Sequence, residues 1–196
     1  MEGRSAPATG RISVLQPPGT YTVTLTVDGE EHTRPLEVRK DPNSAGTVAD
    51  IAQQVDLLNA LKEDMEAGAE AVHKMEALRV QLLTLAKFSE DAEVTTAART
   101  LEKKLQELEL NLVDLRQTGQ GQDGIRFEAV LLGKLGYLTG GMSVADFRPT
   151  DQDVEVQEIL HRELGEYLAA LDALVGGDVA DLNAMLRSKG LGIIGE

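Results

Sequence analysis

The chain of 196 residues contains neither cysteine nor tryptophan, and aromatic residues make up only 3% of it. Without cysteine, disulfide bonds and thiolate metal ligands are excluded, and the redox compartment of the protein stays open. Sugar-binding surfaces and nucleic-acid stacking platforms both depend on aromatic faces. The scarcity of aromatic residues therefore argues against both classes of binding protein.

Basic residues are also in short supply, with 19 Lys and Arg against 33 Asp and Glu and a formal net charge of −14. Such a chain repels a polyanion, so we expect no nucleic-acid partner, whereas an acidic surface suits solubility or a basic protein partner. No segment approaches the roughly 18 apolar residues of a membrane span, and residues 1–15 lack the apolar core of a signal peptide. We expect no direct membrane insertion. Either the protein stays where it is made, or the chain is a fragment or processed form.

One stretch of the chain, Pro17 to Pro42, has the pattern of β-strands. Threonine alternates with apolar residues from Thr20 to Val27, which is typical of a strand with one buried and one wet face. Asp28-Gly29 then supplies a turn, and a second run extends from Glu31 to Arg39. Because Pro35 within it suits an edge strand or a bulge, the stretch predicts a hairpin.

Arg11 to Leu15 is a candidate third strand. Even three strands fall well short of the roughly seven in an Ig-like sandwich, so the β element would be incomplete. A sheet this small is marginal alone and leaves open edges. It requires a cover from the helices, from missing N-terminal sequence or from another chain.

Beyond residue 42 the pattern is helical. A first helix is expected from the N-cap Thr47 to about Lys87, with a candidate bend within it at Gly68. Another helix, the third, is expected from Ile125 to Leu138. Thr150 is the expected N-cap of a fourth helix, broken at Gly176-Gly177 before a short last helix that ends near Ser188 with Gly190 after it. The second helix carries a heptad seam of seven apolar residues: Val94, Ala98, Leu101, Leu105, Leu108, Leu112 and Leu115.

These patterns predict a mainly α fold, an antiparallel four-helix bundle with a small N-terminal antiparallel β element that is an incomplete Ig-like sheet. The expected organisation is a flexible tail at 1–10, the β element at 11–42, the helical bundle at 43–190 and a C-terminal tail at 191–196.

Three features resemble functional sites but have simpler explanations. Gly119, Gly121 and Gly124 spell GxGxxG, but a helix rather than a strand precedes them, so the spacing predicts a plain interhelical loop. His32 has no identifiable Ser, Cys or carboxylate partner for catalysis. The acidic run Asp151, Asp153 and Glu155 lacks the glycine and distal glutamate of an EF-hand, and acids at a helix start explain it.

A fourth pattern, Glu-x-x-His, occurs at Glu70 with His73 and at Glu158 with His161. Two such motifs on two helices are typical of di-iron carboxylate bundles. At about 100° per residue, however, the two glutamates lie well away from the apolar faces of their helices. Ligands of a buried metal would point inward, so we expect no metal site.

The run PPGTYTVTLTVDGEEHTRPLEVRKDP resembles the strand pair that closes a small β domain near the C-terminus of secreted bacterial β-propeller proteins, a family labelled sortilin-like or BNR/Asp-box glycosyl hydrolases. The helical part is similar to the segment after that domain in the family, and the resemblance covers about residues 17–190 in all. The similar segments are DLRQTGQGQDGIRF at 114–127, LLGKLGYL at 131–138 and PTDQDVEVQEIL at 149–160. The family's Asp-box repeat, Ser-x-Asp-x-Gly-x-x-Trp, does not occur in this sequence, so the resemblance carries over no catalytic residue.

The sequence therefore predicts a non-enzymatic protein-protein interaction or scaffold module, without catalytic, cofactor-binding or metal-binding residues and with no identifiable small-molecule substrate. The expected partner or packing face comprises Tyr21, Val23, Leu25, Leu36 and Val38. The resemblance implies an extracytoplasmic location, periplasmic or secreted, where an accessory subunit docked on a larger membrane complex would fit. The alternative is the C-terminal fragment of a sortilin-like glycosyl hydrolase whose propeller is absent.

Overall fold

The computed structural model describes residues 14–117 and 123–195. The fold is mainly helical with one small antiparallel sheet, as the sequence predicted, and the predicted flexible tail at 1–10 lies outside the described residues. In chain order the elements are β1 (Gly19–Val27), β2 (Glu30–Val38), α1 (Val48–Phe88), α2 (Ala92–Leu112), α3 (Asp123–Arg126), α4 (Leu131–Met142), α5 (Asp151–Leu174), the π-helical turn η1 (Val175–Val179) and α6 (Ala180–Ser188).

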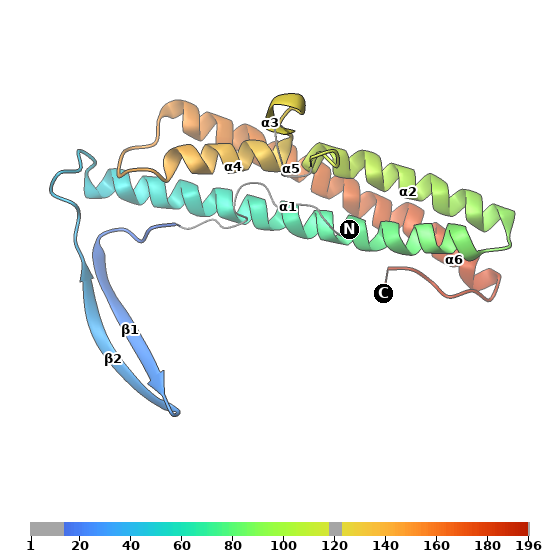
Figure 1. Cartoon of the computed structure of the whole chain (residues 1–196), viewed down its shortest axis with the longest axis horizontal. Helices are drawn as coiled ribbons and strands as arrows, with labels where there is room; N and C mark the ends of the chain where they lie inside the picture. The colour runs from blue at the N-terminus through green and yellow to red at the C-terminus, as the bar shows by residue number, and fades with distance from the viewer. Residues whose placement is uncertain (1–13, 118–122, 196) are drawn as a thin grey trace.

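The helical elements from α1 to α6, here called the helical body, form a long rod built on α1 (Figure 1). Helices α2 and α4 both run back against α1 and lie one after the other along it, while α5 returns in the direction of α1. Both α2 and α4 pack on α1 and on α5, but they touch each other only slightly. At one end of the rod α4 lies beside α1 and α5, and at the other end of the rod α2 lies beside α1 and α5. The predicted bundle of four helices side by side is therefore not confirmed.

Helix α1 begins where the sequence predicted. The Thr47 hydroxyl accepts a hydrogen bond from the Asp50 amide at 3.1 Å, and the Asp50 carboxylate accepts one from the Thr47 amide at 2.9 Å. This capping box satisfies amides that have no partner within the helix. The Thr47 hydroxyl also donates to the Asp50 carboxylate at 2.7 Å, and this bond, together with the one from the Thr47 amide, holds the pKa of Asp50 below its usual value. The helix then runs unbroken for 41 residues, so Gly68 does not interrupt it.

The core is built from leucine, with smaller contributions from valine, alanine and methionine, and it extends along the length of the rod. Leu61, Met75 and Leu82 of α1 are fully buried, as are Leu105 of α2 and Leu135 of α4. The apolar seam expected on α2 is buried from Val94 to Leu112. A stripe of this kind buries its side chains along the whole helix, which explains why α1 and α2 pack lengthwise.

The seam ends earlier than the heptad predicted. Helix α2 stops at Leu112, and Leu115 lies in a turn. The Asp114 carboxylate accepts hydrogen bonds from the amide and the guanidinium of Arg116, both at 2.9 Å. Such a local bond gives the backbone an alternative to the helix, which explains why the prediction for Leu115 was wrong.

Two other predicted boundaries were wrong. The helix expected from Ile125 to Leu138 is divided into α3 and α4, and Arg116 stacks on the ring of Phe127 between them, 4.5 Å from the ring centre. The break expected at Gly176-Gly177 is instead the π-helical turn η1, through which α5 continues into α6. A π-turn accommodates an extra residue without ending a helix.

Candidate docking surface on the β-hairpin

Strands β1 and β2 pair antiparallel around a two-residue turn. Asp28 has a φ of 51° and Gly29 a φ of 88°, and positive values at both positions characterise the type I′ turn, whose twist matches that of the strands. Val27 lies opposite Glu30, and the pairing continues without a bulge to Gly19 opposite Val38. The turn sequence Asp-Gly therefore fixes the register of the whole hairpin.

This register gathers the apolar side chains of both strands on one face, because directly opposed residues project to the same side of a sheet. Tyr21 lies opposite Leu36, Val23 opposite Arg34 and Leu25 opposite His32. We call this the apolar face of the hairpin. Its six apolar members are Tyr21, Val23, Leu25, Val27, Leu36 and Val38. The reverse face carries the four threonines of β1 with Glu31, Thr33, Pro35 and Glu37.

The apolar face is largely exposed. Val23 is 48% exposed, Leu25 60%, Val27 48% and Leu36 49%, while Tyr21 and Val38 are half-buried. Both strands project away from the helical body (Figure 1), and within the described residues their packing is almost wholly against each other. The helices therefore do not supply the cover that a small sheet with an apolar face requires.

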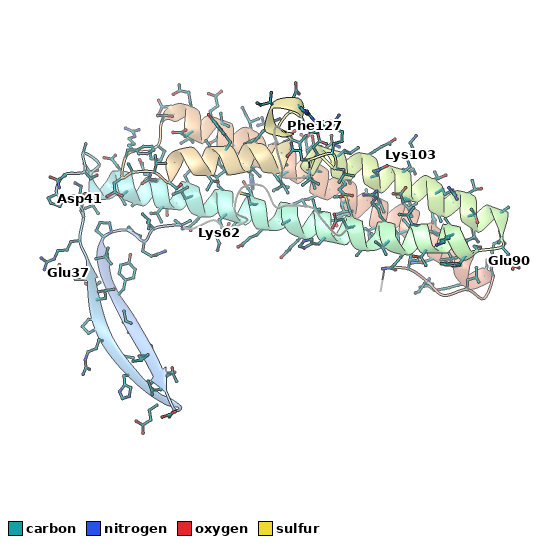
Figure 2. The ribbon with its side chains drawn as sticks, viewed as in Figure 1. Glu37, Asp41, Lys62, Glu90, Lys103 and Phe127 are labelled. Atoms are coloured by element: carbon teal, nitrogen blue, oxygen red, sulfur yellow. The ribbon has the colours of Figure 1, made fainter. Side chains whose placement is uncertain are left out.

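The hairpin is nevertheless attached to the helical body at its base. The Lys40 ammonium donates to the Ser44 carbonyl at 2.6 Å, and the Ser44 hydroxyl donates to the carbonyl of Asp146, between α4 and α5, at 3.1 Å. Gly46 lies so close that an added Cβ would be 2.8 Å from that same carbonyl. In Figure 2, Asp41 lies at this junction and Glu37 lies just beyond it on β2. The junction fixes the point from which the hairpin projects.

All five residues predicted from the sequence as a partner or packing face lie on the apolar face: Tyr21, Val23, Leu25, Leu36 and Val38. Val27 was missed, although the same alternation includes it. Of the candidate third strand, Val14 and Leu15 are not in a strand, and residues 11–13 lie outside the described residues. Val14 instead packs partly buried against the core of the helical body.

The Glu-x-x-His residues do not form a metal centre. Glu70 and Glu158 are exposed, as their helical positions predicted, and so are His73 and His161. His161 instead approaches Asp64 of α1, with 2.7 Å between Nδ1 and the carboxylate oxygen, and Asp64 is only 5% exposed. Among the described residues no three His, Asp or Glu side chains come together as metal ligands would. Asp64 was missed, because nothing local in the sequence marks it as buried.

The remaining motifs are structural or lie outside the described part. The Thr150 hydroxyl accepts from the Asp153 amide at 3.1 Å, which confirms the predicted N-cap of α5, and the Asp153 carboxylate accepts from the Thr150 amide at 2.8 Å and so completes a capping box. Gly119 and Gly121 are outside the described residues, so the interpretation of GxGxxG as a loop stays a prediction. His32 is exposed on the hairpin opposite Leu25.

Two open cavities lie on the helical body. One, of about 370 Å³, lies beside the start of α5 and includes Asp56, Arg148 and Asp151. The other, of about 400 Å³, lies between α1 and the C-terminal segment and includes Lys74 and Arg187. No serine or histidine is among the described residues that line either cavity. The hairpin is therefore the stronger candidate for a functional surface.

No helix in the described part of the chain is both long and apolar enough to span a membrane. Comparison of the chain with protein-family models, with curated proteins and with solved structures found no match. The resemblance to sortilin-like propeller proteins is therefore still a prediction from the sequence.

Proposed function

We propose that this protein is a non-catalytic interaction or scaffold module whose docking surface is the apolar face of the β-hairpin. One observation carries the proposal: the apolar residues of β1 and β2 share one face, and that face projects into solvent. Burying apolar area stabilises a complex by roughly 25 cal/mol per Å² before the costs of association. A contiguous exposed apolar patch is one of the features that mark a protein interaction site.

The chemistry of the hairpin indicates what kind of partner would cover it. The apolar face is two strands wide, and sheets with an apolar face pack face to face against another sheet about 10 Å away. Arg34 and His32 lie on the same face nearer the turn. We therefore propose a β-rich protein partner with an apolar sheet face. Packed face to face in this way, the hairpin and the partner's sheet would form the two layers of an Ig-like sandwich.

The setting that fits this module is outside the cytoplasm, as an accessory subunit docked on a larger membrane complex. The absence of cysteine and the acidic net charge of −14 are compatible with such a setting. The proposal also rests on the family resemblance of the hairpin sequence.

The test is site-specific photocrosslinking in the native host. Benzoylphenylalanine replaces Leu25 on the apolar face or Thr24 on the reverse face, so the two probes sit on adjacent residues of β1 but point to opposite sides. We expect a covalent product with a different protein from position 25 and none from position 24. Equal labelling from the two positions, or none from position 25, would contradict docking through the apolar face.

A second candidate is the C-terminal part of a sortilin-like β-propeller glycosyl hydrolase, and the uncovered hairpin also favours it. A sheet of two strands is what remains when the other strands of a β domain lie elsewhere. The genomic sequence upstream of Met1 separates the two candidates. A propeller continuing in frame supports the hydrolase fragment, whereas an in-frame stop codon before an independent start supports the separate module.

A further inference from the structure

We propose that two copies of this chain associate through the outer edge of β1, which pairs antiparallel with β1 of the second copy to form a four-stranded sheet. This goes beyond the proposed function, which concerns the apolar face and not the edge. In the described residues β1 has β2 on one side and no strand on the other.

The register shows which backbone groups of β1 are available. A two-residue turn closes on a hydrogen-bonded pair, here Val27 with Glu30, and bonded and non-bonded pairs then alternate along the hairpin. The pair of Thr22 with Pro35 is consequently a non-bonded one, which agrees with the missing amide hydrogen of proline. The threonines of β1 therefore direct their amides and carbonyls outward, to the free edge: Thr20, Thr22, Thr24 and Thr26.

The two edges of the hairpin differ in their capacity to pair. The outer edge of β2 is interrupted by Pro35 and flanked by charged residues of that strand, including Glu31 and Glu37. Charges and proline are the features by which natural proteins prevent pairing at a sheet edge. Strand β1, GTYTVTLTV, contains neither over its nine residues. The pairing edge is therefore that of β1.

Strand β1 is also complementary to itself. When Val23 of one copy faces Val23 of the other, Thr22 lies opposite Thr24 and Thr20 opposite Thr26, so the outward amides and carbonyls meet as bonded pairs. On the other side of the sheet, Tyr21 lies opposite Leu25 of the second copy. Threonine thus meets threonine and apolar meets apolar throughout, which is what a two-fold interface requires.

Electrostatic repulsion does not prevent this association. Each copy has a net charge of −14, and the acidic helical bodies would repel each other at close range. The hairpin, however, holds its edge away from the helical body over nine residues, about 30 Å at roughly 3.3 Å per residue. This exceeds the Debye length of about 8 Å at physiological salt, so the repulsion is largely screened.

The first test compares two proline variants by sedimentation velocity over about 1 to 300 µM, the range of a weak protein interface. Thr24 and Thr33 lie opposite each other in the same non-bonded pair, so proline at either one removes only an outward amide. We expect the wild type and Thr33→Pro to dimerise and Thr24→Pro to be monomeric at every concentration. A monomeric wild type overturns the proposal, whether or not another protein binds that edge, as does a dimeric Thr24→Pro.

The second test determines the register between the two β1 strands, and it does not require the hairpin to fold with a proline in it. The natural chain has no cysteine, so a single introduced cysteine reports only on contact between copies. Val23→Cys places the two thiols on the two-fold axis with Cβ atoms about 4.5–5.5 Å apart. Leu25→Cys, on the same apolar face, places them about 13 Å apart. We expect mild oxidation of the full chain to link Val23→Cys rapidly and Leu25→Cys not at all. Equal linking of both variants, or of neither, overturns the proposed pairing.

Discussion

At the residue scale, Arg79 is a buried positive charge held by two carboxylates. It is 5% exposed, and its guanidinium lies 2.5 Å from the Glu109 carboxylate, which is 0% exposed, and 2.9 Å from Glu102. Burial alone would lower the pKa of Arg79, but the two carboxylates more than offset this and raise it. The cluster links α1 to α2 through paired charges inside an otherwise apolar contact.

Removing one member of this cluster should be costly. Arg79→Met deprives the buried Glu109 carboxylate of its ion pair, and we expect the free energy of unfolding to fall by about 3–5 kcal/mol. The double variant Arg79→Met/Glu109→Met removes both of the most deeply buried charges of the cluster, and only the half-buried Glu102 still lacks Arg79, so it should recover part of the loss. Urea unfolding of the wild type, Arg79→Met, Glu109→Met and the double variant measures both effects. A double variant as unstable as Arg79→Met would show that the pair itself, and not the buried carboxylate that has lost Arg79, sets the stability.

Asp91 gives the protein a dependence on pH at the start of α2. The Lys189 ammonium donates to its carboxylate at 2.7 Å, and this bond, together with those from the Val94 and Glu93 amides, holds the pKa of Asp91 below its usual value. A carboxylate with a lowered pKa in the folded state stabilises it above the unfolded pKa of about 3.9 and loses this contribution as the pH falls through the folded value.

Asp91→Asn keeps a side chain that caps a helix but removes the ionisation. We expect its urea midpoint to lie below that of the wild type at pH 7, and the difference to shrink as the pH falls below the unfolded pKa of about 3.9. Glu63→Gln, on the exposed face of α1, serves as the matched control and should show a smaller difference at pH 7. A difference for Asp91→Asn that persists unchanged at the lowest pH would exclude ionisation as its cause.

At the scale of the element, α1 depends on a glycine for its contact with α4 and α5. An added Cβ on Gly68 would lie 2.5 Å from Leu132 of α4 and 3.6 Å from Leu164 of α5. Both leucines are buried, at 6% and 2% exposed. Gly68 therefore allows close packing in a helix that continues unbroken through it.

Two glycine replacements within long helices should have opposite signs. Gly68→Ala gains helix propensity but overpacks the contact with Leu132, so we expect a net loss of about 1–2 kcal/mol in the free energy of unfolding. Gly165→Ala, in α5 with nothing within 4 Å of the added Cβ, should gain about 0.5–1 kcal/mol. Thermal or urea unfolding measures both changes.

A second substitution at Leu132 tests whether overpacking is the cause of the expected loss of stability in Gly68→Ala. In the background Leu132→Ala the space beside Gly68 is free, so adding Gly68→Ala should there be neutral or stabilising. If Gly68→Ala is as harmful with alanine at position 132 as with leucine, the overpacking explanation fails.

At the scale of the whole molecule, we expect the hairpin and the helical body to be independent in stability. The strands pack almost wholly against each other, and their ends, Gly19 and Val38, lie opposite each other as a bonded pair about 5.5 Å apart. A Gly-Ser linker can therefore replace residues 19–38 without straining the junction at Ser44 and Gly46.

We expect this excised chain to keep the free energy of unfolding of the helical body to within about 0.5 kcal/mol, because the replaced residues contribute almost nothing to its core. The same chain should lose the dimerisation proposed above. Circular dichroism at 222 nm during urea unfolding measures the first effect and sedimentation the second. A large loss of stability would show that the hairpin is part of the fold and not an appendage.

The sequence by itself determined the hairpin and the starts of two helices. The alternation in β1 and the Asp28-Gly29 turn predict the hairpin, and Thr47 and Thr150 predict two helix starts, because each of these features depends on residues a few positions apart. Only the tertiary structure decided that α2 and α4 lie one after the other along α1, that Arg79 and Asp64 are buried, and that no helix covers the hairpin in the described part of the chain. These depend on contacts between residues far apart in the chain, such as Arg79 with Glu109, and no local pattern encodes which distant surfaces will meet.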